Sequence, residues 1–188
     1  MQSNKYYILT SLIFLFVFSS CSDKEKYCEE APNVNNIEID IPLNDLTDDM
    51  VSLRSQEEAT RFIQDHSFIA NYFFERRRYG SDSIVGKNMI NIFSNPAYKD
   101  TLYQQVRNTF GDFTDLQADF EDAFKYYKHY YPEVAVPELE IVLAGLQKDL
   151  FVSDSLISIA ADYFLGPDAA YVPNGVPDYI LMRYEKEY

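Results

Sequence analysis

The chain has 188 residues, with 16 basic and 30 acidic side chains and a formal net charge of −14. This charge argues against binding to nucleic acid or to an anionic membrane surface, because both require positive charge on the protein. The length suits one ordinary domain. The 16 tyrosines and 14 phenylalanines supply enough apolar surface for a core.

The N-terminus has the pattern of a secretory signal peptide. Lys5 precedes an apolar run, Ile8–Phe18, which is followed by Ser19, Ser20 and Cys21. This run is shorter than the ~20 apolar residues that a membrane-spanning helix needs. A basic start, a short apolar core and small residues before a cleavage site are typical of signal peptides. We therefore expect residues 1–20 to be removed.

The Ser-Ser-Cys sequence resembles a bacterial lipobox, in which cleavage occurs before a cysteine that carries lipid, including palmitate. It predicts Cys21 as the lipid attachment site, although an ordinary secreted protein with a chance cysteine is an alternative. Residues 1–20 contain one lysine and no acidic residue, so their loss changes the formal charge from −14 to −15. Lipid on Cys21 would hold the protein to a membrane without a spanning helix.

Residues 21–36 are expected to form a flexible, lipidated tether. The segment is charged, contains Pro32 and shows no hydrophobic period. Cys28 would be the single remaining thiol, which cannot build an internal disulfide framework. The acidic, lysine-containing segment after Cys21 resembles tethers that route some lipoproteins to the cell surface. We expect the protein on the outer membrane, on either its periplasmic or its surface face.

The first half of the mature chain is predicted to be mainly helical after one strand. Ile37, Ile39 and Ile41 alternate with acidic residues, which predicts a half-buried strand that Pro42 ends. Ser55 and Glu58 form a capping-box pattern at the start of a helix. The inward face of this helix would carry Phe62, Ile63, His66, Ile69 and Phe73, and Arg76, Arg77 and Arg78 would close it. Residues 80–86 are predicted as a loop and 87–93 as a short helix.

Two further helices and two strands are predicted after residue 94. Asn95 and Pro96 open a helix with an apolar stripe that ends at Gly111. Thr114 and Gln117 suggest a capping box for the next helix, which Pro132 breaks. The two stripes consist of Tyr98, Leu102, Val106 and Phe110, and of Leu116, Phe120, Phe124, Tyr127 and Tyr131. Strands are predicted over 139–143 and in 155–165, and a last short helix over 177–187.

These elements predict an α+β fold in which mostly amphipathic helices pack on a small β-sheet. Residues 37–188 would form one envelope domain behind the tether. The sequence shows no internal repeat.

The residues that could carry chemistry are few. His66 and His129 are the only histidines, and they form no HExxH or paired-histidine motif, so no zinc site is expected. Asp45, Asp48 and Asp49 lack the spacing of a calcium loop and are interpreted as turn and helix-start residues. No phosphate loop or nucleophile elbow occurs. We therefore expect no catalytic residue, metal or cofactor.

Four other residues are site candidates. Asp154 and Asp162 could form an acid–base pair, but Asp154 fits a turn. Asp162 lies in an apolar segment, where a buried carboxylate must be hydrogen-bonded, so a structural role is the simpler hypothesis. Tyr126 and Tyr130 are expected to point outward from their helix, where they could contact a ligand or partner.

Two blocks resemble the GldB-type gliding-motility lipoproteins of the Bacteroidetes. Residues 123–137 (AFKYYKHYYPEVAVP) form an aromatic stretch that ends in proline, and residues 154–166 (DSLISIAADYFLG) follow after one strand. The second block is similar to a pattern of that family in which Asp, Leu, Ile, Asp, Tyr or Phe, Leu and Gly follow one another in this order. Its matching positions are Asp154, Leu156, Ile159, Asp162, Phe164, Leu165 and Gly166.

The resemblance implies a non-enzymatic envelope lipoprotein that works with other envelope proteins of the motility and secretion apparatus. It implies no catalytic residue. Family members continue well beyond the position of Tyr188, so a short or C-terminally truncated relative is expected. The alternatives are a surface glycan-binding lipoprotein and the N-terminal part of a degenerate hydrolase-like domain.

Overall fold

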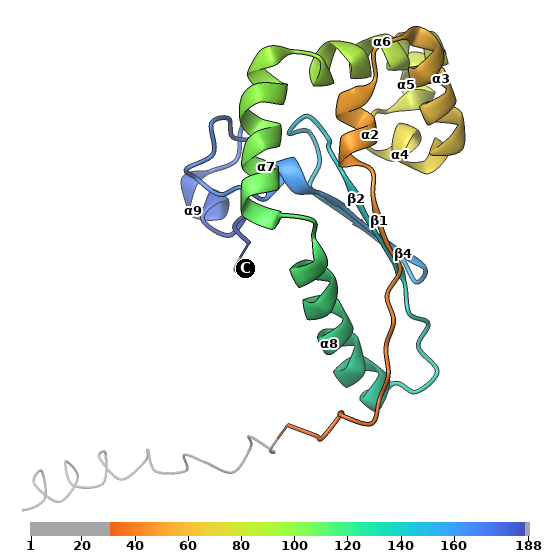
Figure 1. Cartoon of the computed structure of the whole chain (residues 1–188), viewed down its shortest axis with the longest axis vertical. Coiled ribbons are helices and arrows are strands. Elements are labelled where there is room, and N and C mark those ends of the chain that lie inside the picture. Colours follow the sequence, from red (N-terminus) through yellow and green to blue (C-terminus); the bar gives the residue numbers. More distant parts are fainter. Residues whose placement is uncertain (1–30, 187–188) are drawn as a thin grey trace, which may run out of the picture. The chain divides into compact units, whose positions relative to one another are not determined.

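The computed structural model describes residues 31–186 (Figure 1). Contacts divide the chain into two units, residues 1–34 and residues 35–188, and the account below concerns the second. The predicted signal peptide, the lipid site Cys21 and most of the tether lie outside the described residues. Among the described residues, no helix combines the length and apolar character needed to cross a membrane.

A four-stranded mixed sheet lies at the centre of residues 35–186. Its strands are β1 (Leu43–Asp45), β2 (Glu138–Val142), β3 (Leu150–Val152) and β4 (Leu156–Ala160). The strand order is β1-β2-β4-β3, in which β1, β2 and β4 are parallel and β3 is an antiparallel edge strand. β2 is buried along most of its length because it has neighbours on both sides.

Helices pack on both faces of this sheet and confirm the α+β class. The α-helices of the described residues are α2 (Thr47–Ser52), α3 (Gln56–Asp65), α4 (Ser67–Tyr72), α5 (Arg76–Tyr79), α6 (Asp82–Phe93), α7 (Tyr103–Phe110), α8 (Thr114–Tyr130) and α9 (Asp178–Leu181). Phe151 packs on Phe68 and Tyr72 of α4 on one face of the sheet. On the opposite face, Leu150 and Ile159 of the sheet line a cavity together with Phe110 of α7 and Leu116 of α8.

The strand predicted over residues 37–41 is wrong, because sheet pairing begins only after Pro42. Its burial does alternate, and Ile41 is fully buried. However, side chains of α8 take the place of a neighbouring strand. Gln117 Nε2 donates to the carbonyl oxygen of Ile41 at 2.7 Å, and the amide of Ile41 donates to Glu121 Oε1 at 3.2 Å. The backbone is thus satisfied without a strand.

The helix predicted from Ser55 to Arg78 is divided into three. Its start is confirmed, since Ser55 and Glu58 form both hydrogen bonds of a capping box. The backbone leaves helical geometry at His66 (φ −115°, ψ 53°) and again at Glu75, which is left-handed. The three arginines therefore form the separate helix α5, and the predicted loop at 80–86 is wrong because α6 already begins at Asp82.

Asp82 explains why α6 begins early. Arg76 binds its carboxylate with two hydrogen bonds of 2.6 and 2.7 Å, which fixes the connection between α5 and α6. Gly86 lies inside α6, where a Cβ atom would come within 3.0 Å of Ala59 in α3. This glycine thus permits close packing of α3 on α6 and does not mark a loop.

The capping box predicted at Thr114 and Gln117 is also wrong. Phe113, in a left-handed conformation, precedes α8, and no side chain caps the helix. The backbone amide and hydroxyl of Thr114 both donate to Asp112 Oδ1 instead. The side chain of Gln117 donates its hydrogen bond to the carbonyl oxygen of Ile41 instead.

The inward stripe of α8 is correct only for its first half. Leu116, Phe120 and Phe124 are half-buried against the core. The pattern predicts Tyr127 and Tyr131 inside as well, but their exposed fractions are 46% and 61%. Tyr127 lines an open cavity, and Tyr131 follows the last residue of α8.

The remaining elements follow the sequence more closely. A helical segment begins at Pro96, its apolar stripe faces inward, and Gly111 ends α7 with φ +62°. The segment opens with a π-helical stretch, η1 (Tyr98–Leu102). β2 and β4 confirm the two predicted strands, and the 3₁₀ turn η2 (Ala161–Tyr163) follows β4. The sequence pattern does not predict β3, and α9 is shorter than expected.

Candidate functional site

The helical segment formed by η1 and α7 runs past the carboxyl ends of the three parallel strands. α7 contacts η2, which directly follows β4, and a polar cluster lies at each end of the segment. In sheets with parallel strands, ligands commonly bind at this edge. The two clusters therefore lie at the edge of the sheet where a ligand-binding or catalytic site is most expected.

The first cluster surrounds Asp162, which is 1% exposed. Its Oδ1 accepts a hydrogen bond from the amide of Ala144 at 2.9 Å, and its Oδ2 accepts from the amide of Leu146 at 3.0 Å. The Tyr98 hydroxyl also donates to Oδ2 at 2.9 Å. Asp162 thus ties the loop after β2 and the start of η1 to the end of β4.

Burial dominates the electrostatics of this cluster. It raises the pKa of Asp162, although the hydrogen bonds from Ala144, Leu146 and Tyr98 oppose the shift. Burial also raises the pKa of Tyr98 well above its usual value, and the charge of Asp162 acts in the same direction. The Asp162 carboxylate is therefore closed off from solvent and hydrogen-bonded to Tyr98 and to two backbone amides.

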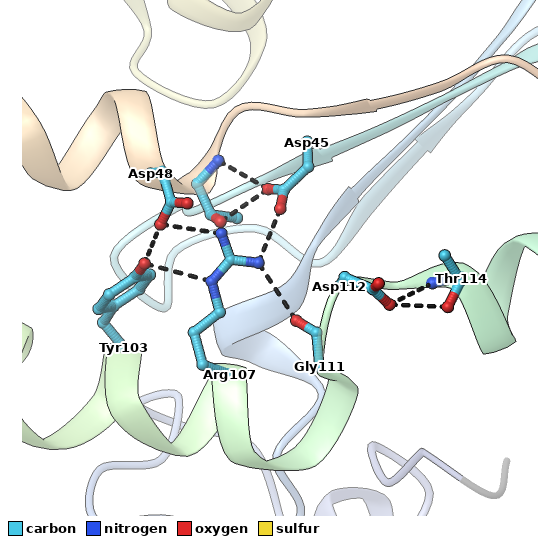
Figure 2. A network of polar contacts seen from close by, with 8 residues as sticks. Asp45, Asp48, Tyr103, Arg107, Gly111, Asp112 and Thr114 are labelled. Carbon is cyan, nitrogen blue, oxygen red and sulfur yellow. Dashed lines mark hydrogen bonds and ion pairs between the residues drawn. The ribbon is translucent and has the colours of Figure 1, made fainter.

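The second cluster is an ion-pair network around Arg107 of α7, shown in Figure 2. Nη1 of Arg107 contacts Asp45 Oδ2 at 2.7 Å and the Gly111 carbonyl oxygen at 3.2 Å, and Nη2 contacts Asp48 at 2.9 Å. Nε donates to the Tyr103 hydroxyl at 3.2 Å, and that hydroxyl in turn donates to Asp48. Arg107 therefore connects α7 to the end of β1 and the start of α2.

The pKa shifts agree with this network. The hydrogen bond from Tyr103 lowers the pKa of Asp48, and Arg107 lowers it further. Burial alone would lower the pKa of Arg107, but its hydrogen bonds to Tyr103, Asp48 and Asp45 outweigh burial and raise it. The donors of the guanidinium are directed at protein acceptors, so this cluster also holds the fold together.

The Asp162 carboxylate is buried, whereas the Asp48 side chain of the Arg107 cluster is 69% exposed and is bound by Arg107 and Tyr103. Within residues 31–186, no buried side-chain nitrogen or oxygen lacks a hydrogen-bond partner. The same residues contain no group of three or more histidine, cysteine or acidic side chains that could hold a metal. Open cavities occur elsewhere on the surface of this part of the chain.

An apolar cavity lies between the start of α8 and the sheet. It has a volume of ≈ 300 Å³. Leu116 and Phe120 of α8 form one wall, and Ile157 and Ile159 of β4 form the other. Phe164 closes one end beside Glu185 and Lys186 of the C-terminal segment.

A second cavity of ≈ 570 Å³ lies further along α8. Val152 and Ile157 line both cavities, so the two are neighbours, and we call them together the α8 groove. At this second end the wall contains Phe124 and Tyr127 of α8, together with Glu133 and Asp154. The groove thus runs from Phe164 to the exposed tyrosines at the end of α8.

Of the seven residues of the family-like block, Asp154, Ile159 and Phe164 line this groove and Asp162 forms the buried cluster. Asp154 is exposed in the turn between β3 and β4, and Leu156 begins β4. Ile159 and Phe164 line the groove, whereas Leu165 packs against the core. Gly166 has φ +74°, and a Cβ atom there would lie 2.7 Å from Glu185 Cγ.

The structure does not bring Asp154 and Asp162 together as an acid–base pair. They lie at opposite ends of β4, one exposed and the other buried. Tyr126 and Tyr130 point outward, with exposed fractions of 41% and 61%. Sequence reasoning missed Arg107, whose partners Asp45 and Asp48 lie about sixty residues away in a segment interpreted only as a turn and helix start.

The fold and the site define a small α+β protein with two hydrogen-bonded polar clusters and an open apolar groove. A family model described as gliding motility protein GldB matches residues 27–188. The chain therefore belongs to the GldB family of gliding-motility lipoproteins. Comparison with curated protein sequences and with solved structures gives no significant match.

Proposed function

We propose that this chain is a non-enzymatic lipoprotein of the cell envelope that acts through protein contacts in gliding motility and the associated secretion. Membership of the GldB family supports the link to motility and to the envelope. The α8 groove carries the proposal of protein contacts, because it exposes apolar side chains that a partner could cover. The saturated Asp162 and Arg107 clusters support a structural function for the polar residues.

The proposed attachment is lipid on Cys21 after removal of residues 1–20, with the domain on the outer membrane. Lipid attachment would place the groove at the membrane without using the groove for anchoring. Growth with labelled palmitate should label the native chain and not the Cys21→Ser variant. Equal labelling of the two would overturn this attachment site.

Deletion of the gene tests the function itself. We expect deletion to reduce colony spreading and secretion, and the full chain supplied in trans to restore both. A deletion strain that spreads and secretes like its parent would overturn the proposal. Complementation with the Cys21→Ser variant separates a requirement for the anchor from a requirement for the domain.

A second candidate function, glycan binding, is favoured by the four tyrosines at the end of α8. Tyr126, Tyr127, Tyr130 and Tyr131 are all more than 40% exposed, and aromatic faces can stack on sugars. The rings of Tyr127 and Tyr131 are inclined by 57°, however, so they form no flat platform. Affinity electrophoresis in polysaccharide gels should retard the native chain more than a Tyr126→Ala, Tyr130→Ala variant if this function is present.

A further inference from the structure

We propose that the α8 groove binds a short apolar segment of a partner protein that carries lysine or arginine beside Glu133 and Asp154. This inference rests on the proposed function, since it names the chemistry of the contact through which the protein acts. The apolar walls of the groove, its length and the charges at its end each limit what the occupant can be.

The walls of the groove leave apolar surface in contact with solvent. Val152, which lines both cavities, is 63% exposed on the edge strand β3, and Leu116, Phe120 and Ile159 are only half-buried. Covering such surface stabilises a complex by roughly 25 cal/mol per Å² before the costs of association. The occupant must therefore present apolar side chains.

The length of the groove limits the occupant to a short segment. The α8 side chains that line it extend from Leu116 to Tyr127. At 1.5 Å per residue, this part of the helix is about 16 Å long. An extended chain covers that length with about five residues.

The charges select the partner. Glu133 and Asp154 are exposed at the second end of the groove, and neither forms an ion pair in the part of the chain that the structure describes. Lys186 at the first end is already paired with Asp115 at 3.7 Å. A basic flank on the occupant would therefore find unpaired carboxylates at Glu133 and Asp154.

The same charges argue against two other occupants. A second copy of the chain would bring together two molecules with a formal charge of −14 each, so repulsion opposes self-association through this face. A fatty acid or an anionic lipid would place its negative head group beside Glu133 and Asp154 at one end, or beside Glu185 at the other, where Lys186 is already paired with Asp115. A partner segment flanked by lysine or arginine avoids both the repulsion between two acidic chains and the contact of a negative group with carboxylates.

The first test uses model peptides and the full chain. The chain contains no tryptophan, so the emission of a tryptophan in the peptide reports only on binding. We expect Lys-Leu-Leu-Trp-Leu-Leu-Lys to bind saturably, and the same core with glutamate at both ends to bind at least about tenfold more weakly at low salt. Added salt should narrow this difference. Equal binding of the two peptides, or no binding of the lysine peptide, would overturn the proposal.

Charge reversal at the groove supplies a matched pair of variants. The Glu133→Lys, Asp154→Lys variant should lose the preference for the lysine peptide, because both substituted residues are exposed at the groove. The Glu57→Lys, Asp65→Lys variant changes the net charge equally on exposed positions of α3, which do not line the groove, and should keep the preference. If both variants lose it equally, the effect belongs to net charge and the groove assignment is wrong.

The second test identifies the occupant in cells. A photo-crosslinking amino acid at Val152 should join the full chain to another protein, at an apolar segment flanked by lysine or arginine. Crosslinking to a second copy, to lipid or to polysaccharide would overturn the proposal. If the Glu133→Lys, Asp154→Lys variant restores spreading fully in a deletion strain that does not spread, the partner inference fails while the proposed function stands.

Discussion

The hydroxyl of Tyr98 donates a hydrogen bond of 2.9 Å to Oδ2 of Asp162, which lies 64 residues further along the chain. This contact joins the start of the η1–α7 segment to the end of β4. Arg107, at the other end of the same segment, joins it to β1 through Asp45. Two polar contacts therefore fix one helical segment across the carboxyl ends of the parallel strands.

Removal of the Tyr98 hydroxyl should destabilise the fold. In the Tyr98→Phe variant, Asp162 keeps its two backbone donors but loses a hydrogen bond to a buried carboxylate. Such a bond contributes about 1.5–3 kcal/mol to the free energy of unfolding, which urea unfolding followed by circular dichroism can measure. The control is Tyr130→Phe, whose ring is 61% exposed and which should show no measurable change. Equal losses in the two variants would contradict the structural role of the Tyr98–Asp162 contact.

Asp162 should also give the stability a defined pH dependence. Because burial raises its pKa above 3.8, the native state holds this proton more tightly than the unfolded state does. The contribution of Asp162 is therefore complete below pH 3.8 and is lost as the pH rises through the raised native pKa. Asp162→Asn has no group to titrate at this position.

The difference in unfolding free energy between the native chain and Asp162→Asn should consequently shrink as the pH rises. Urea unfolding of both proteins between about pH 3 and pH 8 measures this difference, and other titrating groups largely cancel in it. The contribution of Asp48 to stability has the opposite pH dependence. The hydrogen bond from Tyr103 lowers the pKa of Asp48, so this contribution is lost as the pH falls. A difference that grows with pH would show that the hydrogen bonds to Asp162 outweigh its burial.

Much of the local structure could be predicted because short patterns determine it. The Ser55 capping box, the helix start at Pro96 and the stop at Gly111 each depend on residues within a few positions of one another. The strand at Glu138–Val142 also follows from its own apolar residues. The divisions at His66 and Glu75 were not predictable in this way, since the apolar stripe continues across them.

The site could be predicted only in part. The apolar surroundings of Asp162 indicated a buried, hydrogen-bonded carboxylate, but its partner Tyr98 is distant in sequence and was expected only to face the core. No sequence pattern identifies Arg107 as the centre of an ion-pair network, because one arginine in an amphipathic helix is usually solvated. β3 has three residues, which is too short for a period to be recognised. The α8 groove arises from tertiary packing and has no counterpart in any local pattern.

Replacement of Arg107 by lysine should weaken the network although the charge is kept. Arg107 contacts Asp45, Asp48 and Tyr103 at the same time, whereas an ammonium group cannot reproduce this planar arrangement. We expect a loss of about 1–3 kcal/mol in the free energy of unfolding. The control Arg61→Lys alters a pair whose side chains are 66% and 85% exposed, and it should leave stability unchanged within error. An unchanged Arg107→Lys variant would contradict a role for the planar guanidinium geometry.

Gly166 offers a test of how the C-terminal segment closes the groove. Its amide donates to the Tyr184 carbonyl oxygen at 2.6 Å, and its φ of +74° disfavours any residue with a Cβ atom. Gly166→Ala would add a contact of 2.7 Å with Glu185 Cγ to this backbone strain. Gly175 has φ +77°, but a methyl group added there would have no neighbouring atom within 4 Å. Gly175→Ala therefore introduces the backbone strain without a close contact.

The comparison of these two variants isolates the close approach from the backbone conformation. Each should lose about 1–2 kcal/mol of unfolding free energy because of the left-handed conformation. Gly166→Ala should lose about 1 kcal/mol more, because Glu185 must move away from the added methyl group. The same movement displaces a residue that lines the groove, so binding of the lysine peptide should change in Gly166→Ala and not in Gly175→Ala. Equal stability and equal peptide binding in the two variants would show that the C-terminal segment does not pack on Gly166.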